Sequence, residues 1–296
     1  MFGAIEAGGT KFVCGMGTFP ENLAIVQIPT STPESTISEA LTFFRSSKEP
    51  IQAVGIGSFG PIDLHPDSPT YGYITATPKP GWRDFNLAGA IAGELKVPVG
   101  FDTDVGAAAL GEARWGAAAG LTDFVYLTVG TGIGGSAIVN GSILHGLVHS
   151  EMGHIRVPHD RSADPFPGGC PFHSDCLEGL ASGPAMQARW GVPASQLSEH
   201  HEAWTLEANY LALGLVSLIC TLSPQRIIIG GGVMQQKHLF GLIRRKLASL
   251  LNGYIQAREL TDCIDDYVVS PALGSRSGVL GALVLAETAF NGKAPK

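Results

Sequence analysis

Short apolar runs separated by turn residues open the chain and predict a series of β-strands. The first run ends at a Gly8-Gly9 turn and a second run follows directly, which is the pattern of a β-hairpin. Longer stretches with apolar residues three or four positions apart alternate with the later runs and predict helices. The predicted strands of this part are 2–7, 11–16, 23–28, 53–57 and 97–101, and the predicted helices begin near Pro33, Phe85 and Asp104.

The same succession starts again near Asp123. Residues 124–129 form an apolar run, a glycine-rich turn covers 130–135, and residues 136–139 predict the next strand. This second strand–turn–strand unit indicates a weak internal duplication. Further along, the pattern predicts helices at 202–222, after Gly232 and at 277–290, and a strand at 226–229. Alternating strands and helices with hairpins indicate an α/β fold with mixed sheets, and 296 residues suffice for two domains.

Charge and apolar length restrict the class of partner. The net charge is −7, so we expect no basic face and no nucleic-acid partner. The longest apolar stretch, 210–222, is shorter than a membrane span, so it predicts a buried helix and no membrane association. The start of the chain lacks the basic region of a secretory signal, and the five cysteines are an odd number; both favour a cytoplasmic location.

Three glycine turns that follow apolar strands are candidates for phosphate binding. Glycines leave backbone N–H groups open to phosphate oxygens, and threonine hydroxyls add donors. Each turn alone is more often a plain hairpin or packing turn, and neither the Walker-A spacing nor a dinucleotide fingerprint is present. Their order within two similar halves favours nucleotide binding. The turns are Gly8-Gly9-Thr10-Lys11, residues 130–135 including Thr131 and Gly132, and Gly230-Gly231-Gly232-Val233.

Two carboxylates stand where a predicted strand meets a predicted helix, in the segment Asp102-Thr103-Asp104. Either aspartate could simply cap the helix, which is the commoner role at such a position. Phosphoryl transfer to a hydroxyl needs a carboxylate that orients the hydroxyl and accepts its proton, and this segment could supply one.

A cysteine and histidine cluster predicts a structural zinc site. Cys170, His173 and Cys176 have the spacing C-x-x-H-x-x-C, and His154 would complete a tetrahedral set. The loop 160–169 has no apolar face, so we expect the metal to supply its missing core. The alternative is a pair of unrelated cysteines in a loop rich in glycine and proline. The other histidines, among them His200 and His201, are expected on the solvated surface.

Together these segments resemble the ROK family of repressors, unclassified reading frames and sugar kinases. The resemblance spans nearly the whole chain. The sequence of the first motif, residues 5–12, most resembles the family's bacterial fructokinase branch, whose members contain zinc. The segments that carry it are 5–12, Asp102-Thr103-Asp104, 127–135, Glu151-Met152-Gly153-His154 and 170–178.

The resemblance implies a two-domain actin-like ATPase fold, related to ribonuclease H, with an active site in an interdomain cleft. The N-terminal domain would cover 1–118 and be completed by a C-terminal helix at 277–296. The C-terminal domain would cover 119–276 and contain the zinc loop 154–178. A homodimer is also implied.

The implied activity is ATP-dependent phosphorylation of a hexose, with fructose converted to fructose 6-phosphate. Mannose, glucose and N-acetylmannosamine stay open as acceptors. A different class is a non-catalytic sugar sensor or a repressor relative. A repressor of this family would need a helix-turn-helix before the first strand, which here is predicted from residue 2.

The resemblance also implies roles for single residues. Asp104 would be the general base, Mg²⁺ would bridge the ATP phosphates, and Glu6 would hold Mg²⁺ through water where related kinases carry aspartate. Glu151 and Glu178 would bind sugar, although solvated acids on loops are the alternative. Thr103 stands where many relatives carry asparagine. The implied sugar contacts are Thr103, Asp104, Glu151, His154 and Glu178; the zinc ligands are His154, Cys170, His173 and Cys176; the ATP contacts, with the glycine turns, are Gly8, Gly9, Thr10, Lys11, Thr131, Gly132, Pro184, Gly232, Val233, Met234, Gln235 and Gln236.

Overall fold

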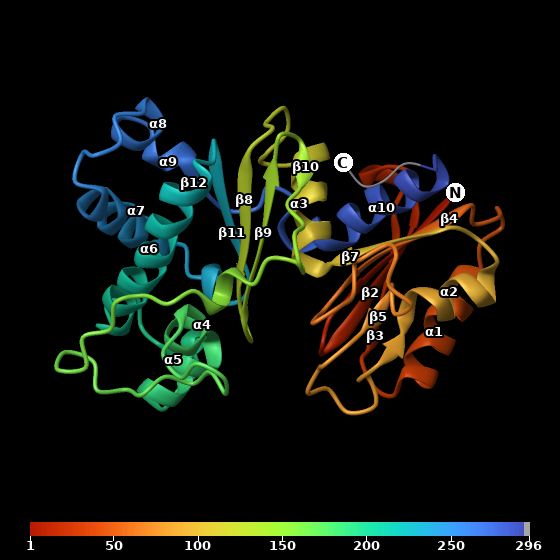
Figure 1. The fold of residues 1–296 in the computed structure, drawn as a ribbon, viewed down its shortest axis with the longest axis horizontal. Helices are drawn as coiled ribbons and strands as arrows, with labels where there is room; N and C mark the ends of the chain where they lie inside the picture. The colour runs from red at the N-terminus through yellow and green to blue at the C-terminus, as the bar shows by residue number, and fades with distance from the viewer. Residues whose placement is uncertain (293–296) are drawn as a thin grey trace. The chain divides into compact units, whose positions relative to one another are not determined.

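The computed structural model describes residues 1–292, which fold into two compact units (Figure 1). The first unit combines Met1–Gly120, Gly141–Ser150 and the chain from Ala272 onward. The second combines Leu121–Asn140 and Glu151–Pro271. The chain therefore returns to the first unit after it has built the second.

A five-stranded mixed sheet of order β3-β2-β1-β4-β7 forms the centre of the first unit. Strands β1, β4 and β7 are parallel, and β1, β2 and β3 are antiparallel neighbours. The elements are β1 (Phe2–Ala7), β2 (Lys11–Gly17), β3 (Ala24–Pro29), α1 (Pro33–Arg45), β4 (Ala53–Ser58), β5 (Tyr73–Ile74), β6 (Phe85–Asn86), α2 (Leu87–Leu95), β7 (Val99–Thr103), α3 (Asp104–Trp115) and α10 (Ser277–Phe290).

Side chains of β1 alternate between two cores, as the period of a strand requires. Ile5 and Ala7 belong to a cluster that α1 and α2 share, and these helices lie side by side in Figure 1. Ala4 packs instead with Val279 and Leu283 of α10. The alternation places Glu6, two positions after Ala4, on the α10 face.

Helix α10 approaches its neighbours at backbone contact distance. A Cβ atom at Gly281 would lie 1.5 Å from the carbonyl oxygen of Ala107 in α3. A Cβ atom at Gly55 in β4 would lie 1.8 Å from the carbonyl oxygen of Ala282. No side chain fits at either place, so this packing depends on glycine.

The sheet that begins at β8 has the order β10-β9-β8-β11-β12, with β8, β11 and β12 parallel and β9 antiparallel to β8. The elements are β8 (Phe124–Val129), β9 (Ile133–Val139), β10 (Ser142–Ile143), α4 (Leu177–Ala181), α5 (Gly183–Trp190), α6 (Ala203–Leu222), β11 (Arg226–Gly230), α7 (His238–Leu251), α8 (Arg258–Thr261), α9 (Ile264–Tyr267) and β12 (Val268–Val269).

Within residues 1–292, α6 alone has the length and apolar composition that could cross a membrane. Half of its apolar window is buried inside the protein. Trp204, Leu211 and Leu215 lie in the core of the second unit with residues of β8 and β11. Helix α6 thus packs as the core helix of a globular unit, as its sequence predicted.

Most predicted elements are confirmed. Strands β1 and β8 and helix α10 begin and end at the residues predicted from the apolar pattern, 2–7, 124–129 and 277–290. The C-terminal helix predicted for 277–296 ends at Phe290, because Asn291 caps it and a turn follows; residues 293–296 lie outside the described residues. Helix α2 begins two residues later than predicted because the side chain of Asn86 accepts the Gly89 N–H and caps it. After Gly232 a single 3₁₀ turn, Val233–Gln235, precedes α7.

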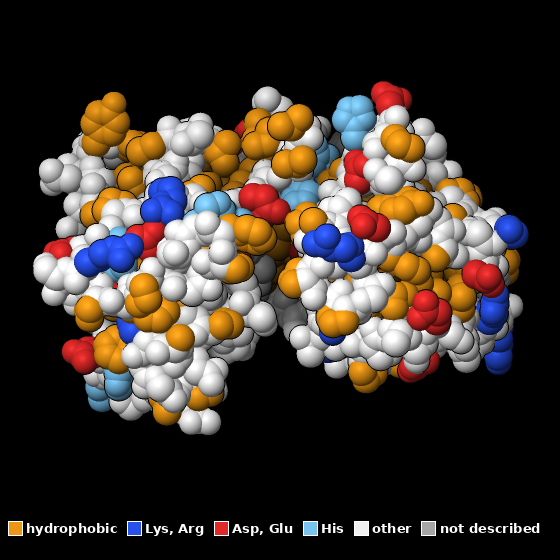
Figure 2. Space-filling model, turned by 60° about the horizontal axis from the view of Figure 1, so that its bottom comes forward, with side chains coloured by type: hydrophobic (Ala, Val, Ile, Leu, Met, Phe, Trp, Pro, Cys, Tyr) orange, Lys and Arg blue, Asp and Glu red, His pale blue; other side chains and the backbone are white. Residues whose placement is uncertain are grey.

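Charged side chains do not form a basic tract on the face drawn in Figure 2. Lys and Arg side chains lie there in small separate groups with acidic side chains between them. This distribution agrees with the net charge of −7 of the whole chain.

A fully buried carboxylate joins the end of α3 to the segment that leads into α10. Glu112 accepts hydrogen bonds from the amides of Ala117, Ala272 and Leu273 at 2.6, 3.1 and 3.0 Å and from the hydroxyl of Ser277 at 2.7 Å. Ala117 lies shortly before the chain first leaves this unit after Gly120, and the other donors lie where the chain finally returns to it at Ala272. Glu112 therefore holds the segment that follows α3 and the segment that leads into α10 together within the first unit.

Replacement of this carboxylate should destabilise the protein. Glu112→Gln keeps the shape but turns an NH₂ group toward N–H donors, so we expect a loss of roughly 2–4 kcal/mol in the free energy of unfolding. Urea denaturation measures it. The control Glu94→Gln removes an exposed partner of Arg45, where a loss below about 1 kcal/mol is expected. Equal losses in the two variants would contradict the role given to Glu112.

Candidate active site

Glu6 is half-buried, and its Oε2 atom is shielded from solvent beneath the first turn of α10. A Cβ atom at Gly278 would lie 2.4 Å from its Cδ atom, so the helix backbone covers the side chain. Burial, and then the neighbouring Asp104, raise the pKa of Glu6 to about 7, against the opposing effects of Lys11 and the Val279 N–H. Within residues 1–292 no hydrogen-bond partner reaches its Oε2 atom. An unpartnered carboxylate oxygen beside a second carboxylate suits a divalent cation.

Hydrogen bonds to its carbonyl oxygens hold the first glycine turn in place, and no packing covers Gly9. The Thr30 hydroxyl donates to the Gly8 carbonyl at 2.7 Å, and the Lys79 ammonium donates to the Gly9 carbonyl at 2.6 Å. The Gly8 N–H donates to the Lys11 carbonyl at 3.0 Å. A Cβ atom at Gly9 would meet nothing within 4 Å. Packing therefore does not require this glycine, and its surface is open to a ligand.

The helix that follows β7 is capped by Thr103, whose hydroxyl accepts the Gly106 N–H at 2.9 Å. The alternative that Asp102 or Asp104 is the cap is therefore wrong. A hydroxyl caps as well as a carboxylate, and Thr103 lies at the last extended position before the helix. Thr103 is 7% exposed, so its side chain serves α3 rather than solvent.

The two aspartates have different environments. Asp102 is fully buried; its Oδ1 atom accepts the Thr103 N–H at 2.7 Å, and its Oδ2 atom lies 3.1 Å from Nε2 of His145. Asp104 is half-buried, and its Oδ1 atom accepts the Val105 N–H at 2.9 Å. Asp104 is thus the one of the two that a substrate can reach.

Sequence reasoning missed two histidines of the first unit. His145 pairs with Asp102, 43 residues earlier, and His149 is buried and accepts the Ile62 N–H at 3.3 Å, 87 residues earlier. Both were expected on the surface; His145 is exposed as expected but pairs with Asp102, whereas His149 is buried. No spacing along the chain signals contacts between segments so far apart.

Three segments assigned to ATP by the resemblance lie together in the second unit. The Gly183 N–H donates to the Gly130 carbonyl at 2.8 Å, and a Cβ atom at Gly130 would lie 3.8 Å from the Gly232 nitrogen. The turn after β8 is shorter than predicted because β9 already begins at Ile133. Pro184 is exposed in the first turn of α5. The parallel strands β8 and β11 bring these turns to one edge.

The run that follows Gly232 divides between core and surface. Val233 and Met234 are 3% and 5% exposed and belong to the core of the second unit. Gln235 is exposed and Gln236 is half-buried. A nucleotide could therefore contact the first two only through their backbone.

Glu178 lies in the first turn of α4 and is tied to the second glycine turn. Its Oε2 atom accepts the Ile133 N–H at 2.9 Å, and a Cβ atom at Gly132 would lie 2.6 Å from it. The alternative that Glu178 is a solvated loop acid is wrong, because this carboxylate holds the end of the turn.

The cysteine and histidine cluster has the geometry of a metal site. The four ligand atoms lie within 4.8 Å of one another. Nδ1 of His154 is 3.7 and 3.6 Å from the sulfurs of Cys170 and Cys176, and Nδ1 of His173 is 3.6 Å from that of Cys170. A tetrahedral ion with its usual Zn–S and Zn–N bond lengths separates sulfur and nitrogen by about 3.6 Å. The cluster could therefore hold a metal ion without rearrangement.

Gly153 sets the position of His154. A Cβ atom at Gly153 would lie 1.8 Å from the Ile133 carbonyl oxygen, so the turn Met152–His154 rests on the backbone of β9. Nδ1 of His154 then faces the sulfurs, and Nε2 lies 4.0 Å from the Glu151 carboxylate. A metal on Nδ1 would leave the Nε2–H as a donor beside Glu151.

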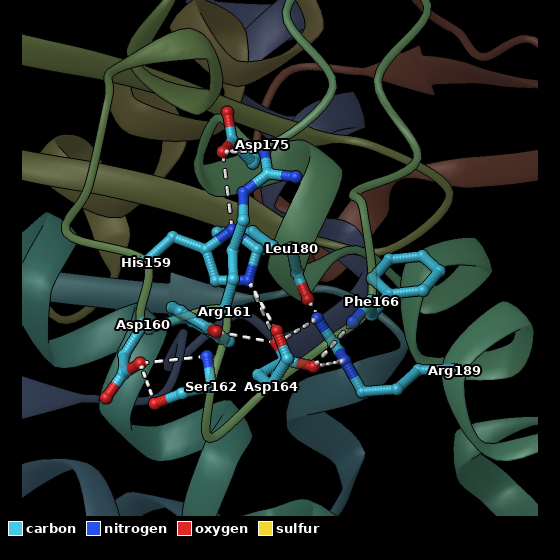
Figure 3. Close-up of polar contacts among 10 residues, drawn as sticks. His159, Asp160, Arg161, Ser162, Asp164, Phe166, Asp175, Leu180 and Arg189 are labelled. Carbon is cyan, nitrogen blue, oxygen red and sulfur yellow. Dashed lines mark hydrogen bonds and ion pairs between the residues drawn. The ribbon is translucent and has the colours of Figure 1, made fainter.

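A buried polar network supports the loop behind the cluster (Figure 3). Asp164 is 4% exposed; it accepts the Tyr210 hydroxyl at 2.6 Å and lies 3.1 Å from an Arg189 nitrogen. The pKa of Asp164 is lowered, because the hydrogen bond from Tyr210 and the charge of Arg189 outweigh its burial. The Asp164 carbonyl lies 3.0 Å from Nε2 of His159. The loop therefore has buried polar contacts of its own, in addition to the cluster that could hold a metal.

Asp175 connects this network to the cluster, because it lies between His173 and Cys176. Its carboxylate lies 3.3 Å from Nδ1 of His159 and 2.9 Å from Arg161. Hydrogen bonds from His159 and then Arg161 lower the pKa of Asp175. The carboxylate thus stays ionised and holds the ligand loop in place.

A side chain at Gly153 should impair metal binding. Gly153→Ala must displace His154 from β9, and we expect metal affinity to fall by about 10–100-fold. Elemental analysis and chelator competition measure it, with about one metal ion per chain expected in the unaltered protein. Gly93→Ala is the control, because a Cβ atom there meets nothing within 4 Å. Unchanged metal content and affinity in Gly153→Ala would contradict this account.

Comparisons with known proteins agree with the site. The sequence profile of the ROK family matches residues 2–289. The chain is 50% identical over 295 residues to a provisionally named fructokinase of Bacillus subtilis, covering 99% of this chain and 98% of that protein. It is 43% identical over 293 residues to a fructokinase of Pediococcus pentosaceus, covering 98% and 99%. A solved ROK family glucokinase from Streptomyces griseus, in complex with glucose and AMPPNP, has a TM-score of 0.74 at 25% identity, covering 97% and 99%.

Proposed function

The chain belongs to the ROK family, and we propose that it is an ATP-dependent hexose kinase whose preferred acceptor is fructose. The observation that carries the proposal is the pair of neighbouring carboxylates, Glu6 and Asp104, beside the open turn at Gly9. The identity to a fructokinase over nearly the whole chain supports fructose as the acceptor.

Asp104 would act as the general base. Its Oδ1 atom accepts the Val105 N–H, and this contact orients the carboxylate at the start of α3. The acceptor hydroxyl would transfer its proton to Asp104 as its oxygen bonds to the γ-phosphorus and the bond to the ADP oxygen breaks. Asp102 cannot take this role, since it is fully buried and already bound by Thr103 and His145.

Glu6 would hold Mg²⁺, directly or through water. The partnerless Oε2 atom fits such an ion, and a cation there would relieve the repulsion between Glu6 and Asp104. When bound with ATP, Mg²⁺ neutralises charge on the β- and γ-phosphates. The extra methylene of glutamate relative to aspartate extends the reach of a carboxylate that α10 covers.

Backbone amides would contribute most of the ATP contacts. In the first unit these are Gly8, Gly9, Thr10 and Lys11. In the second unit the proposed contacts are Thr131, Gly132, Pro184, Gly232, Val233, Met234, Gln235 and Gln236. The proximity of Gly130, Gly183 and Gly232 supports a common nucleotide site there. Binding of AMPPNP by the glucokinase relative agrees with ATP as the donor.

The acceptor would be held by Asp104 with Glu151, His154 and Glu178. Thr103 would take part through its backbone, because its side chain caps α3. The metal at the cluster is zinc in this proposal, since two thiolates and two imidazoles in a closed tetrahedral set suit Zn²⁺. A homodimer, a cytoplasmic location and an active site between domains 1–118 and 119–276 remain predictions.

A panel of sugars tests the acceptor. ADP release with fructose, mannose, glucose and N-acetylmannosamine should give the highest kcat/KM for fructose. Glucose is the specific rival, because the glucokinase relative binds it. A higher kcat/KM for any other sugar would contradict fructose as the preferred acceptor but agree with a sugar kinase. No turnover with any sugar would contradict the proposed kinase activity.

A single substitution tests the base. Asp104→Asn keeps the size and the contact with Val105 but removes the basicity, so kcat should fall by about 10²–10⁴-fold. The dissociation constant for fructose should change little, because the amide still binds a hydroxyl. Asp67→Asn, at an exposed aspartate of the same unit, is the control. A folded Asp104→Asn variant with unaltered kcat would exclude Asp104 as the base.

A further inference from the structure

We propose that His145 is a further acceptor-binding residue, which Asp102 anchors beside Asp104 so that its imidazole contacts a hydroxyl of the sugar. The inference rests on the proposed function and adds a specificity-determining contact to the same site. It begins from a histidine that had no assigned role and from an aspartate that the phosphoryl transfer does not use.

The buried carboxylate of Asp102 contacts the partly exposed imidazole ring of His145. Asp102 is fully buried, whereas the His145 side chain is 36% exposed. Nε2 of His145 lies 3.1 Å from Oδ2 of Asp102, and the other oxygen is occupied by the Thr103 N–H. The hydrogen bond to Asp102 raises the pKa of His145, and partial burial opposes it. One edge of the imidazole is therefore fixed, and the ring keeps a defined orientation at the surface.

The segment that carries His145 is a short hairpin held by its histidines. His145 and His149 pair across it, and His149 accepts the Ile62 N–H at 3.3 Å. At the tip, Leu147 and Val148 are 96% and 63% exposed, so apolar packing does not hold the tip. The two polar contacts with the first unit place the hairpin where β7 ends and α3 begins.

This place adjoins the proposed acceptor residues along the chain. Asp102 precedes Asp104 by two positions, and the hairpin leads directly to Glu151 and then His154. Asp104, Glu151 and His154 are proposed to meet the sugar. A ring whose Nε2 is fixed by Asp102 can exchange a hydrogen bond with a hydroxyl at low entropic cost, because its rotation is already restricted.

Tyr71 gives independent support for a polar surface at this point. Burial and then the charge of Asp102 raise the pKa of Tyr71. The Tyr71 ring stands edge-on to Phe101 at 6.4 Å and is 38% exposed. Tyr71 therefore adds a partly exposed polar ring next to the end of β7, the strand that carries Asp102.

The test compares two substitutions of His145 in the full-length kinase. His145→Ala removes the anchor and the ring. His145→Gln keeps a donor near the Nε2 position, and so the contact with Asp102, but removes the remaining edge of the imidazole. We expect the KM for fructose to rise about 10–100-fold in His145→Ala. In His145→Gln it should rise several-fold, with the KM for ATP and the Tm unchanged. His200→Ala, at an exposed histidine of the second unit, is the control.

The outcomes separate this inference from the proposed function. If the unaltered protein does not phosphorylate any sugar, the proposed kinase activity is contradicted, whatever the variants show. With an active kinase, an unchanged fructose KM in His145→Ala would overturn the inference. A defect in His145→Ala that His145→Gln fully restores would also overturn it, because His145 would then only anchor the hairpin. Parallel changes in both KM values and in Tm would mean a structural role and would overturn it as well.

Discussion

The approach of α10 to its neighbours without intervening side chains determines where the acidic site of the first unit can form. At Gly281 and Gly55 the backbones are too close for a Cβ atom. The first turn of α10 must then lie directly on Glu6, whose Oε2 atom is shielded from solvent on that face of β1 and has no partner among the described residues. A carboxylate in that position carries a desolvation cost that a hydrocarbon core cannot offset, whereas a bound cation can. The packing that stabilises this unit therefore also creates a place for a charge.

The sequence predicted what depends on local patterns. The apolar run 2–7 forms strand β1 with the predicted bounds. The ligand atoms of Cys170, His173 and Cys176 lie close together, as their spacing predicted. It did not predict which residue caps α3, because Asp102, Thr103 and Asp104 all cap well and only the backbone conformation decides. Nor did it predict the pair of His145 and Asp102 or the network around Asp164. Those contacts join segments with no common period, and only the folded chain brings them together.

The glycines illustrate the same limit. The sequence alone made each glycine turn an equally good candidate for phosphate binding. In the structure a Cβ atom at Gly9 or Gly232 would meet nothing within 4 Å, whereas one at Gly231 would lie 2.3 Å from the Val129 carbonyl oxygen, with φ at +96°. Gly231 is required by the fold itself, and Gly9 and Gly232 are not. A glycine that packing does not explain is the better indication of a ligand, and composition cannot separate the two kinds.

The network around Asp164 changes what a metal at the cluster has to do. Arg189, Tyr210 and His159 hold the loop through buried polar contacts. Burial raises the pKa of the Cys176 thiol to about 11, and a metal ion must displace that proton when it binds. A metal ion on Nδ1 of His154 would leave the Nε2–H as a donor near Glu151. The proposed metal would then act on the site by orienting this one histidine.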